Sequence, residues 1–122
     1  MLTQTLTDTV APAQRRLEIS QQQVDFFQES GYLVVENALT AEEIESLRRE
    51  TARICRGERG QVKGLPPFSP AESDDEIIQR TLCIHFPHKI SQMMFDFLAQ
   101  PTIVDVLTKV IGPDVKCMQS ML

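Results

Sequence analysis

The stretch ALTAEEIESLRRETARICRG, residues 38–57, carries the clearest structural signal in the chain. Thr40 and Glu43 have the spacing of a capping box, in which each side chain satisfies a backbone N–H group at the start of a helix. Acidic residues crowd the beginning of the stretch and arginines its end, which suits the helix dipole. Gly57 then marks the stop. The pattern predicts a helix, and the residues expected to share its stripe are Ile44, Leu47, Thr51 and Ile54.

A second capping box is predicted upstream of this helix. Ser20 and Gln23 have capping-box spacing, and Gly31 supplies the left-handed residue that commonly closes a helix. The β-rich run at 32–35 then predicts a short strand. Residues 1–18 are rich in Thr, Gln and Ala without periodicity, so we expect a disordered leader there and a single ordered unit over 19–122.

Downstream, the sequence predicts a long loop followed by further strands and helices. Residues 57–75 are dense in Gly, Pro, Ser and acidic residues, and loops of this length tend to be lids, binding loops or disordered. Apolar and polar residues alternate over 82–86, as in a strand. Two helices are expected over 88–100 and 101–111, and a last strand from 115. The fold class is therefore α+β, with three scattered strands that look like contributions to a larger sheet.

Composition limits the partners. The chain has 122 residues, 42% of them hydrophobic, and a formal net charge of −5. The size fits one domain, and the acidic balance argues against binding nucleic acid or an anionic membrane. The cysteines are three in number, far apart and without a C-x-x-C motif, which favours a reducing cytoplasm. No stretch has the pattern of a signal peptide or a membrane span, so we expect a cytoplasmic protein.

The only two histidines, His85 and His88, lie in the stretch CIHFPHK. Their spacing would place two metal ligands together on a helix, but Pro87 between them disfavours a helix there. A third ligand would have to come from Asp96 or Asp105 through the fold. We therefore expect no metal site within this chain. We interpret His85 as a strand residue and His88 as the start of the next helix, and keep both as candidates for lining a pocket.

Other reactive side chains have simpler interpretations. Cys83 and Cys117 read as small packing residues, and Cys55 sits at a helix end, where the dipole disfavours a thiolate. The acidic run at 72–76 is expected to be solvated rather than to bind a cation.

The last predicted strand contains one polar side chain on an otherwise apolar face. Gln119 shares that face with Val115, Cys117 and Met121, because side chains alternate along a strand. A buried amide costs desolvation free energy unless it finds partners. Gln119 is therefore either a satisfied core amide or a group that lines a cavity for a polar ligand, and spacing alone leaves both open.

Two stretches together resemble a known family. QVDFFQESGYLVVENALTAEEIESLRRE and CIHFPHKISQMMFDFLAQPTIVDVLTKVIGPDVKCMQSML are similar to the N-terminal part of the phytanoyl-CoA dioxygenase family, which are non-haem Fe(II)/2-oxoglutarate oxygenases. The resemblance implies a double-stranded β-helix (jelly-roll) parent that hydroxylates a small organic substrate. It places Gln119 beside 2-oxoglutarate and Met121 in the lining of the same cavity.

The resemblance also implies that the family's iron-binding residues are missing from this sequence. In the family a His-x-Asp pair and a distant histidine hold iron, and no His-x-Asp occurs here. We therefore expect a fragment that ends before its metal site, is inactive by itself and binds neither Fe(II) nor 2-oxoglutarate. Two alternatives stay open: a small non-catalytic α+β binding module, and a naturally shortened non-catalytic paralogue. Substrate identity, any role for a CoA thioester and oligomeric state are not fixed by the sequence.

Overall fold

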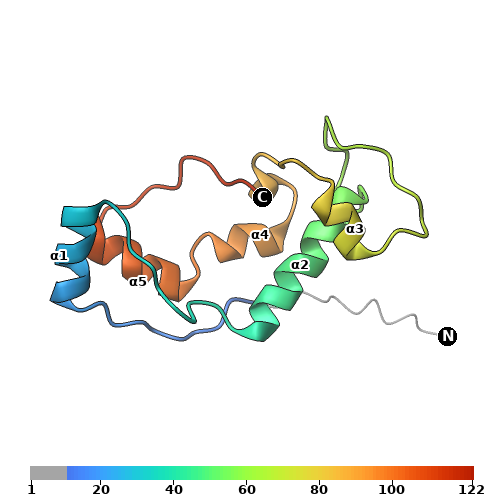
Figure 1. Ribbon diagram of the computed structural model, residues 1–122. Helices are drawn as coiled ribbons and strands as arrows, with labels where there is room; N and C mark the ends of the chain where they lie inside the picture. The colour runs from blue at the N-terminus through green and yellow to red at the C-terminus, as the bar shows by residue number, and fades with distance from the viewer. Residues whose placement is uncertain (1–10) are drawn as a thin grey trace.

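A computed structural model describes residues 11–122, and the described chain is helical. Two pairs of helices pack at opposite ends of the molecule: α1 against α5, and α2 against α3. The short helix α4 lies between them and contacts α2 and η1 (Figure 1). The helices are α1 (Gln21–Ser30), α2 (Ala41–Cys55), α3 (Asp74–Gln79), the 3-10 helix η1 (Pro87–Lys89), α4 (Gln92–Phe97) and α5 (Pro101–Val110). No helix in this part of the chain is long and apolar enough to cross a membrane.

The helices α1 and α2 start at the capping side chains that the sequence predicts. Both predicted capping boxes form, at Ser20 for α1 and at Thr40 for α2, and Gly31 closes α1 in the left-handed conformation with φ 81°. A third capping box, at Ser73, starts α3 just before the end of the stretch predicted as loop. Hydroxyl and carboxamide or carboxylate groups three residues apart therefore set the helix starts, because they satisfy donors that would otherwise be unpaired.

The predicted strands are the main correction. Within residues 11–122 none of the segments 32–35, 82–86 or 115–122 forms a strand, and the only β feature is one isolated antiparallel bridge between His85 and Met121. A jelly roll is not seen in the described residues. The physical reason is that a ladder needs adjacent partners, and the side chains of Tyr32 and Val34 are left 58% and 70% exposed.

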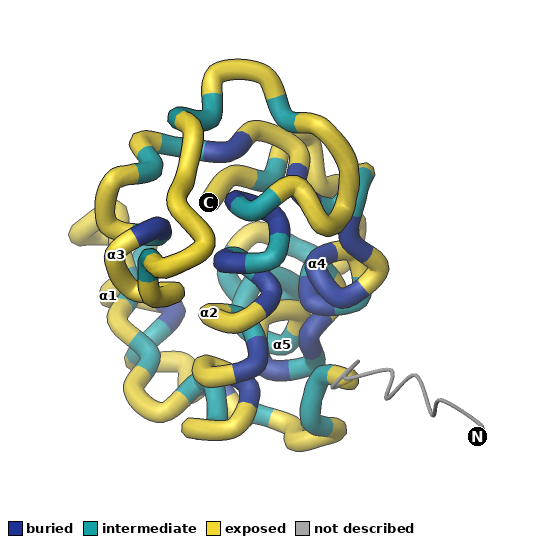
Figure 2. Tube along the Cα trace, turned by 90° about the vertical axis from the view of Figure 1, so that its right-hand side faces the viewer, coloured by how far each residue is buried: buried dark blue, intermediate teal, exposed yellow. Residues whose placement is uncertain are grey.

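The interior lies along one face of α2 (Figure 2). Its apolar part is a cluster made by Ile54, Cys55, Ile77, Ile84 and Met94. The sequence-based stripe is wrong at Ile44, which is 47% exposed. The face that is buried instead begins with polar side chains, Glu43, Ser46 and Glu50, and becomes apolar only at Ile54.

The carboxylate of Glu50 is buried and fully engaged. Arg59 donates to it through two nitrogens, Nε to Oε1 at 2.8 Å and Nη2 to Oε2 at 2.9 Å. The Ser91 hydroxyl donates to Oε1 at 2.5 Å, and the same hydroxyl caps the start of α4. Burial by itself would raise the pKa of Glu50, but the hydrogen bonds from Arg59 and Ser91 outweigh it and lower the pKa.

Glu43 contacts the capping residue of α5, as Glu50 contacts the capping residue of α4. Its Oε1 accepts from the side-chain amide of Gln100 at 3.3 Å, and Gln100 caps the start of α5. The backbone N–H groups of Ala13 and Thr40 donate to the same carboxylate, at 2.8 and 2.7 Å. Burial again works to raise the pKa of Glu43, and these hydrogen bonds lower it. Two acids on one helix thus hold the beginnings of two others.

The segment before α1 also contacts the helices. Arg16 forms an ion pair with Asp105 of α5, and the backbone N–H of Leu17 donates to the same carboxylate at 2.8 Å. Hydrogen bonding from Arg16, then from Leu17, lowers the pKa of Asp105. Residues 11–18 form neither helix nor strand, and residues 1–10 lie outside the described residues. The domain boundary at residue 18 stays a prediction.

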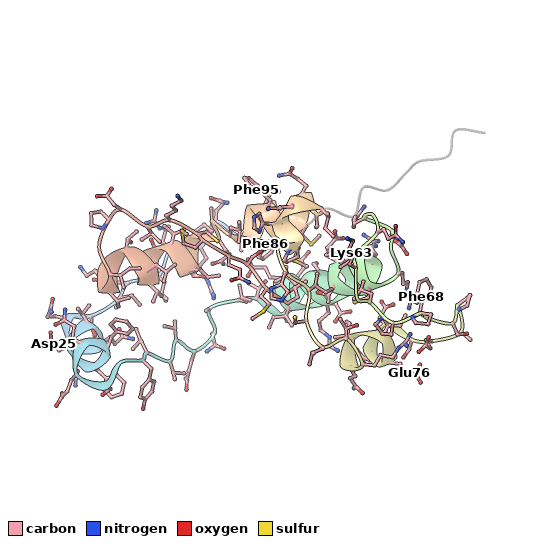
Figure 3. All side chains as sticks on the ribbon, turned by 90° about the horizontal axis from the view of Figure 1, so that it is seen from above. Asp25, Lys63, Phe68, Glu76, Phe86 and Phe95 are labelled. Atoms are coloured by element: carbon pink, nitrogen blue, oxygen red, sulfur yellow. The ribbon has the colours of Figure 1, made fainter. Side chains whose placement is uncertain are left out.

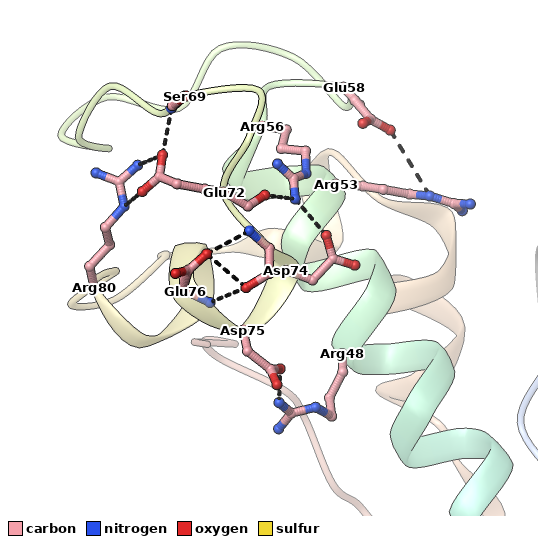
Figure 4. Close-up of polar contacts among 11 residues, drawn as sticks. Arg48, Arg53, Arg56, Glu58, Ser69, Glu72, Asp74, Asp75, Glu76 and Arg80 are labelled. Atoms are coloured by element: carbon pink, nitrogen blue, oxygen red, sulfur yellow. Dashed lines mark hydrogen bonds and ion pairs between the residues drawn. The ribbon is translucent and has the colours of Figure 1, made fainter.

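Ion pairs fasten α3 to α2 at the end of the molecule opposite Asp25 of α1 (Figure 3). The acidic run at 72–76, expected to be solvated, supplies partners for arginines (Figure 4). Arg48 with Asp75 and Arg56 with Asp74 join α2 to α3, whereas Arg80 with Glu72 links the C-cap of α3 to the residue before its N-cap. These side chains are partly exposed, so each pair contributes at most about 1 kcal/mol to stability.

We predict that Glu50→Ala lowers the free energy of unfolding by about 2–3 kcal/mol, because it removes charge-assisted hydrogen bonds and leaves the buried O–H donor of Ser91 without an acceptor. The matched control is Glu45→Ala on the exposed face of α2, expected to change stability by less than about 0.5 kcal/mol. Urea denaturation at neutral pH measures both variants. Equal effects would contradict the assignment.

The pKa of Glu50 also predicts acid sensitivity. A carboxyl whose pKa is lower in the folded chain than its usual value of 4.5 contributes fully above that value and loses the contribution as pH falls through the folded pKa. The urea midpoint of the natural chain should therefore fall between neutral pH and pH about 3 more steeply than that of Glu50→Gln. Parallel pH profiles would show that Glu50 is not the group responsible.

Candidate functional site

The sequence-predicted site residues lie where residues 84–86 pair antiparallel with residues 120–122, next to the 3-10 helix η1. Ile84 and Leu122 exchange both backbone hydrogen bonds, at 2.9 and 3.1 Å. The N–H of Phe86 donates to the carbonyl of Ser120 at 2.9 Å. This short pairing is the β feature that the fold retains. It brings together residues more than thirty positions apart in the chain.

Side chains reinforce the pairing at both histidines. Nδ1 of His85 lies 2.9 Å from Nε2 of Gln119, and Nδ1 of His88 lies 2.5 Å from the hydroxyl of Ser120. His85 also forms the bridge with Met121. Three of the four candidates, His85, Gln119 and Met121, are therefore adjacent, and His88 joins the same segment through Ser120. Their roles in a pocket stay predictions.

The sequence analysis missed two members of this cluster. Sγ of Cys83, interpreted as a packing residue, lies 3.3 Å from Nε2 of His85. Ser120 is the partner of His88. The signal for Cys83 was present in the alternation, because residues 83 and 85 of an extended segment share a face. Nothing local pointed to Ser120, since its partner comes from a distant segment.

The backbone turns sharply between the two histidines. Phe86 adopts the left-handed conformation, φ 56° and ψ 46°, which costs a bulky L-residue about 1–2 kcal/mol. The turn leads directly into η1, whose first residue is Pro87. The ammonium of Lys89 lies 4.6 Å from the centre of the Phe86 ring, and this cation–π contact offsets part of the strain. The conformation lets both histidines reach the same C-terminal segment.

A cavity of about 680 Å³ adjoins this cluster. It lies between the end of α4, α5 and residues 113–119, and Gln119 is part of its wall. Met121, His85 and His88 do not line it. The remaining wall is mainly apolar and includes Phe97, Leu98, Ile103, Val104, Leu107 and Ile111. The Gln119 amide thus links a space of ligand size to the His85 imidazole.

Metal ligands do not converge in this region. Among residues 11–122, no three side chains of His, Cys, Asp or Glu are placed to hold an ion. Asp105 is paired with Arg16, and Asp96 accepts from Gln92 at 2.8 Å, so neither of these carboxylates joins the histidines. The described residues therefore do not fit the iron that the family resemblance implies.

Comparison with known proteins decides the family. A family model described as Phytanoyl-CoA dioxygenase (PhyH) matches residues 27–122. The chain belongs to this family.

The curated relatives are distant, and this chain is much shorter than they are. The protein from Rattus norvegicus named "Phytanoyl-CoA dioxygenase, peroxisomal" is 30% identical over 111 residues, which cover 85% of this chain and 31% of that protein. The Bos taurus protein of the same name is 25% identical over 112 residues, covering 85% of this chain and 32% of that protein. The chain spans about a third of the length of the relatives it matches. No solved structure matches it.

The phytanoyl-CoA dioxygenase match includes every segment that builds the cluster, from α2 to the last described residue. The pairing of 84–86 with 120–122 therefore lies within the part of the chain that matches the family. Arg16 lies before the matched stretch and forms its ion pair with Asp105 of α5, which lies within that stretch.

We predict that His88→Ala loosens the C-terminal segment, because it removes the hydrogen bond to Ser120. Loss of about 1 kcal/mol corresponds to roughly fivefold more opening. Limited trypsin digestion should therefore cleave after Lys116 about fivefold faster, with no change after Lys109 within α5. His88→Asn, which keeps a polar atom near the position of Nδ1, is the control and should digest like the natural chain. Equal cleavage in all three proteins would show that His88 does not anchor the segment.

Proposed function

We propose that this chain is the N-terminal portion of an Fe(II)/2-oxoglutarate-dependent dioxygenase that hydroxylates a small organic substrate. The observation that carries the proposal is membership of the phytanoyl-CoA dioxygenase family over residues 27–122, combined with coverage of about a third of the relatives' length. The same match favours the enzyme over the alternative of a small non-catalytic binding module.

The described residues have a positioning role in this proposal. Gln119 faces the 2-oxoglutarate pocket and is oriented by its contact with His85. Met121 lines the cavity of the complete enzyme, and His85 and His88 lie at the rim of the substrate pocket. Iron and 2-oxoglutarate, when bound to the complete enzyme, supply the oxidation of a C–H bond. No step through iron is assigned to the residues described here, because they do not converge on a metal.

The pairing of 84–86 with 120–122 supports the same proposal. Two extended segments already hydrogen-bonded to each other present the beginning of a sheet, and a jelly roll is built by adding further strands to such a pair. The substrate is proposed only as a small organic molecule. The location of the protein in the cytoplasm stays a prediction from the sequence.

Iron binding tests whether the metal site lies outside these 122 residues. We predict that the 122-residue polypeptide, loaded anaerobically with Fe(II) and desalted, retains far less than one iron per chain by elemental analysis. The coding sequence beyond codon 122 should continue in frame with a His-x-Asp pair. Iron at one equivalent per polypeptide, or a stop codon after Leu122, would contradict the proposal.

Gln119 can be tested in the protein expressed from the continued reading frame. We predict that Gln119→Ala raises KM for 2-oxoglutarate by about tenfold, the loss expected from one well-formed hydrogen bond, while iron content stays the same. Gln61→Ala, an exposed glutamine in the loop after α2, is the control and should leave KM unchanged. An unchanged KM in Gln119→Ala would remove this residue from the 2-oxoglutarate pocket.

A further inference from the structure

Three polar groups in the paired segments form a continuous thiol–imidazole–amide chain. Sγ of Cys83 lies 3.3 Å from Nε2 of His85, and Nδ1 of the same ring lies 2.9 Å from the side-chain amide of Gln119. Cys83 and His85 share a face of one extended segment, while Gln119 comes from the other. A base beside a thiol, with a third group that orients the base, is the arrangement that activates cysteine nucleophiles.

The other two cysteines lack such a partner. Cys117 is exposed, and its thiol donates only to the carbonyl oxygen of Gln119, at 3.6 Å. Cys55 is buried and lies 3.5 Å from the hydroxyl of Thr81. Cys83, of intermediate exposure, is the one cysteine of the chain beside an imidazole.

We propose that Cys83 is a nucleophilic thiol, activated by His85 and held in register by Gln119, and that it is a modification site for soft electrophiles, including peroxides. The proposal stands apart from the oxygenase assignment, because it depends only on side chains described here. Modification would place a new group against His85, at the edge of the cluster.

The reaction with an alkyl halide is a simple displacement. A C–S bond forms as the carbon–halogen bond breaks, the halide leaves with the bonding electrons, and the thiol proton passes to Nε2 of His85. This transfer requires the tautomer with its hydrogen on Nδ1, so that Nε2 is free to accept. In that state the Gln119 amide is turned over about its terminal bond, and Oε1 accepts from Nδ1–H before the thiol proton moves. With a peroxide, an S–O bond forms as the O–O bond breaks. Sulfur is oxidised by two electrons to the sulfenic acid, and the departing oxygen takes the proton.

Iodoacetamide is the first probe, with the alkylation rate of each cysteine followed by mass spectrometry in the folded chain. We expect Cys83 to react about tenfold faster than Cys117, although Cys117 is the more exposed thiol. Slow labelling of buried Cys55 reports that the protein stays folded. A Cys83 rate equal to or below that of Cys117 would overturn the proposal.

Substitutions at the two histidines distinguish activation of the Cys83 thiol by a base from its accessibility to the reagent. His85→Asn should reduce the Cys83 rate to that of Cys117 or below, while His88→Asn leaves it unchanged within twofold. Labelling of Cys55 and Cys117 in the same samples identifies any loss of structure. An unchanged Cys83 rate in His85→Asn, with Cys55 still protected, would exclude His85 as the base.

The positioning role of Gln119 predicts opposite responses to two substitutions of similar size. Gln119→Leu should slow alkylation of Cys83, since the ring loses its hydrogen-bond partner. Gln119→Glu should maintain or raise the rate, because a carboxylate stabilises the protonated imidazole. A merely structural role moves both variants in the same direction, and equal losses would overturn the assignment.

Discussion

Two buried carboxylates on α2 organise the described chain. Glu50 accepts from Ser91, the residue that caps α4, and Glu43 accepts from Gln100, the residue that caps α5. A buried charge is tolerated only when it is paired and hydrogen-bonded, so the positions of Arg59, Ser91 and Gln100 are constrained together. The starts of α4 and α5 are therefore fixed relative to α2. Residues 84–86 precede α4 and residues 120–122 follow α5, so the positions of these paired segments depend on the same interactions.

Local rules predicted the starts of α1 and α2 but neither the short helix α3 nor the packing of the helices. The capping boxes at Ser20 and Thr40 and the glycine that ends α1 are short-range devices, and the structure contains them as predicted. The buried face of α2 was misassigned because acids near a helix start are normally exposed there. Glu43 and Glu50 are buried only because partners arrive from residues 13, 59, 91 and 100, which no local pattern reveals.

The strands were overpredicted because a local sequence pattern does not show whether a segment has neighbours to pair with. Alternation along 82–86 and 115–122 is typical of strands, and in the structure only residues 84–86 and 120–122 of these segments pair with each other. A strand also needs neighbours, and each segment has at most one neighbour within residues 11–122. His85, Gln119 and Met121 lie together in the structure, and their roles in a pocket stay predictions. Ser120 and the contact between Cys83 and His85 follow from the antiparallel register of the two segments, which the sequence did not define.

The contact between residues 84–86 and 120–122 joins the segment before α4 to the segment after α5. It forms the candidate site, and it lies within the stretch that matches the family. Amide hydrogen exchange of the 122-residue polypeptide, resolved by residue with NMR, tests it most directly. The account predicts slow exchange at the N–H groups of Ile84, Phe86 and Leu122, and fast exchange at Cys83, His85 and Met121, which alternate with them. Uniformly fast exchange across both segments, in a chain whose α2 amides stay protected, would contradict it.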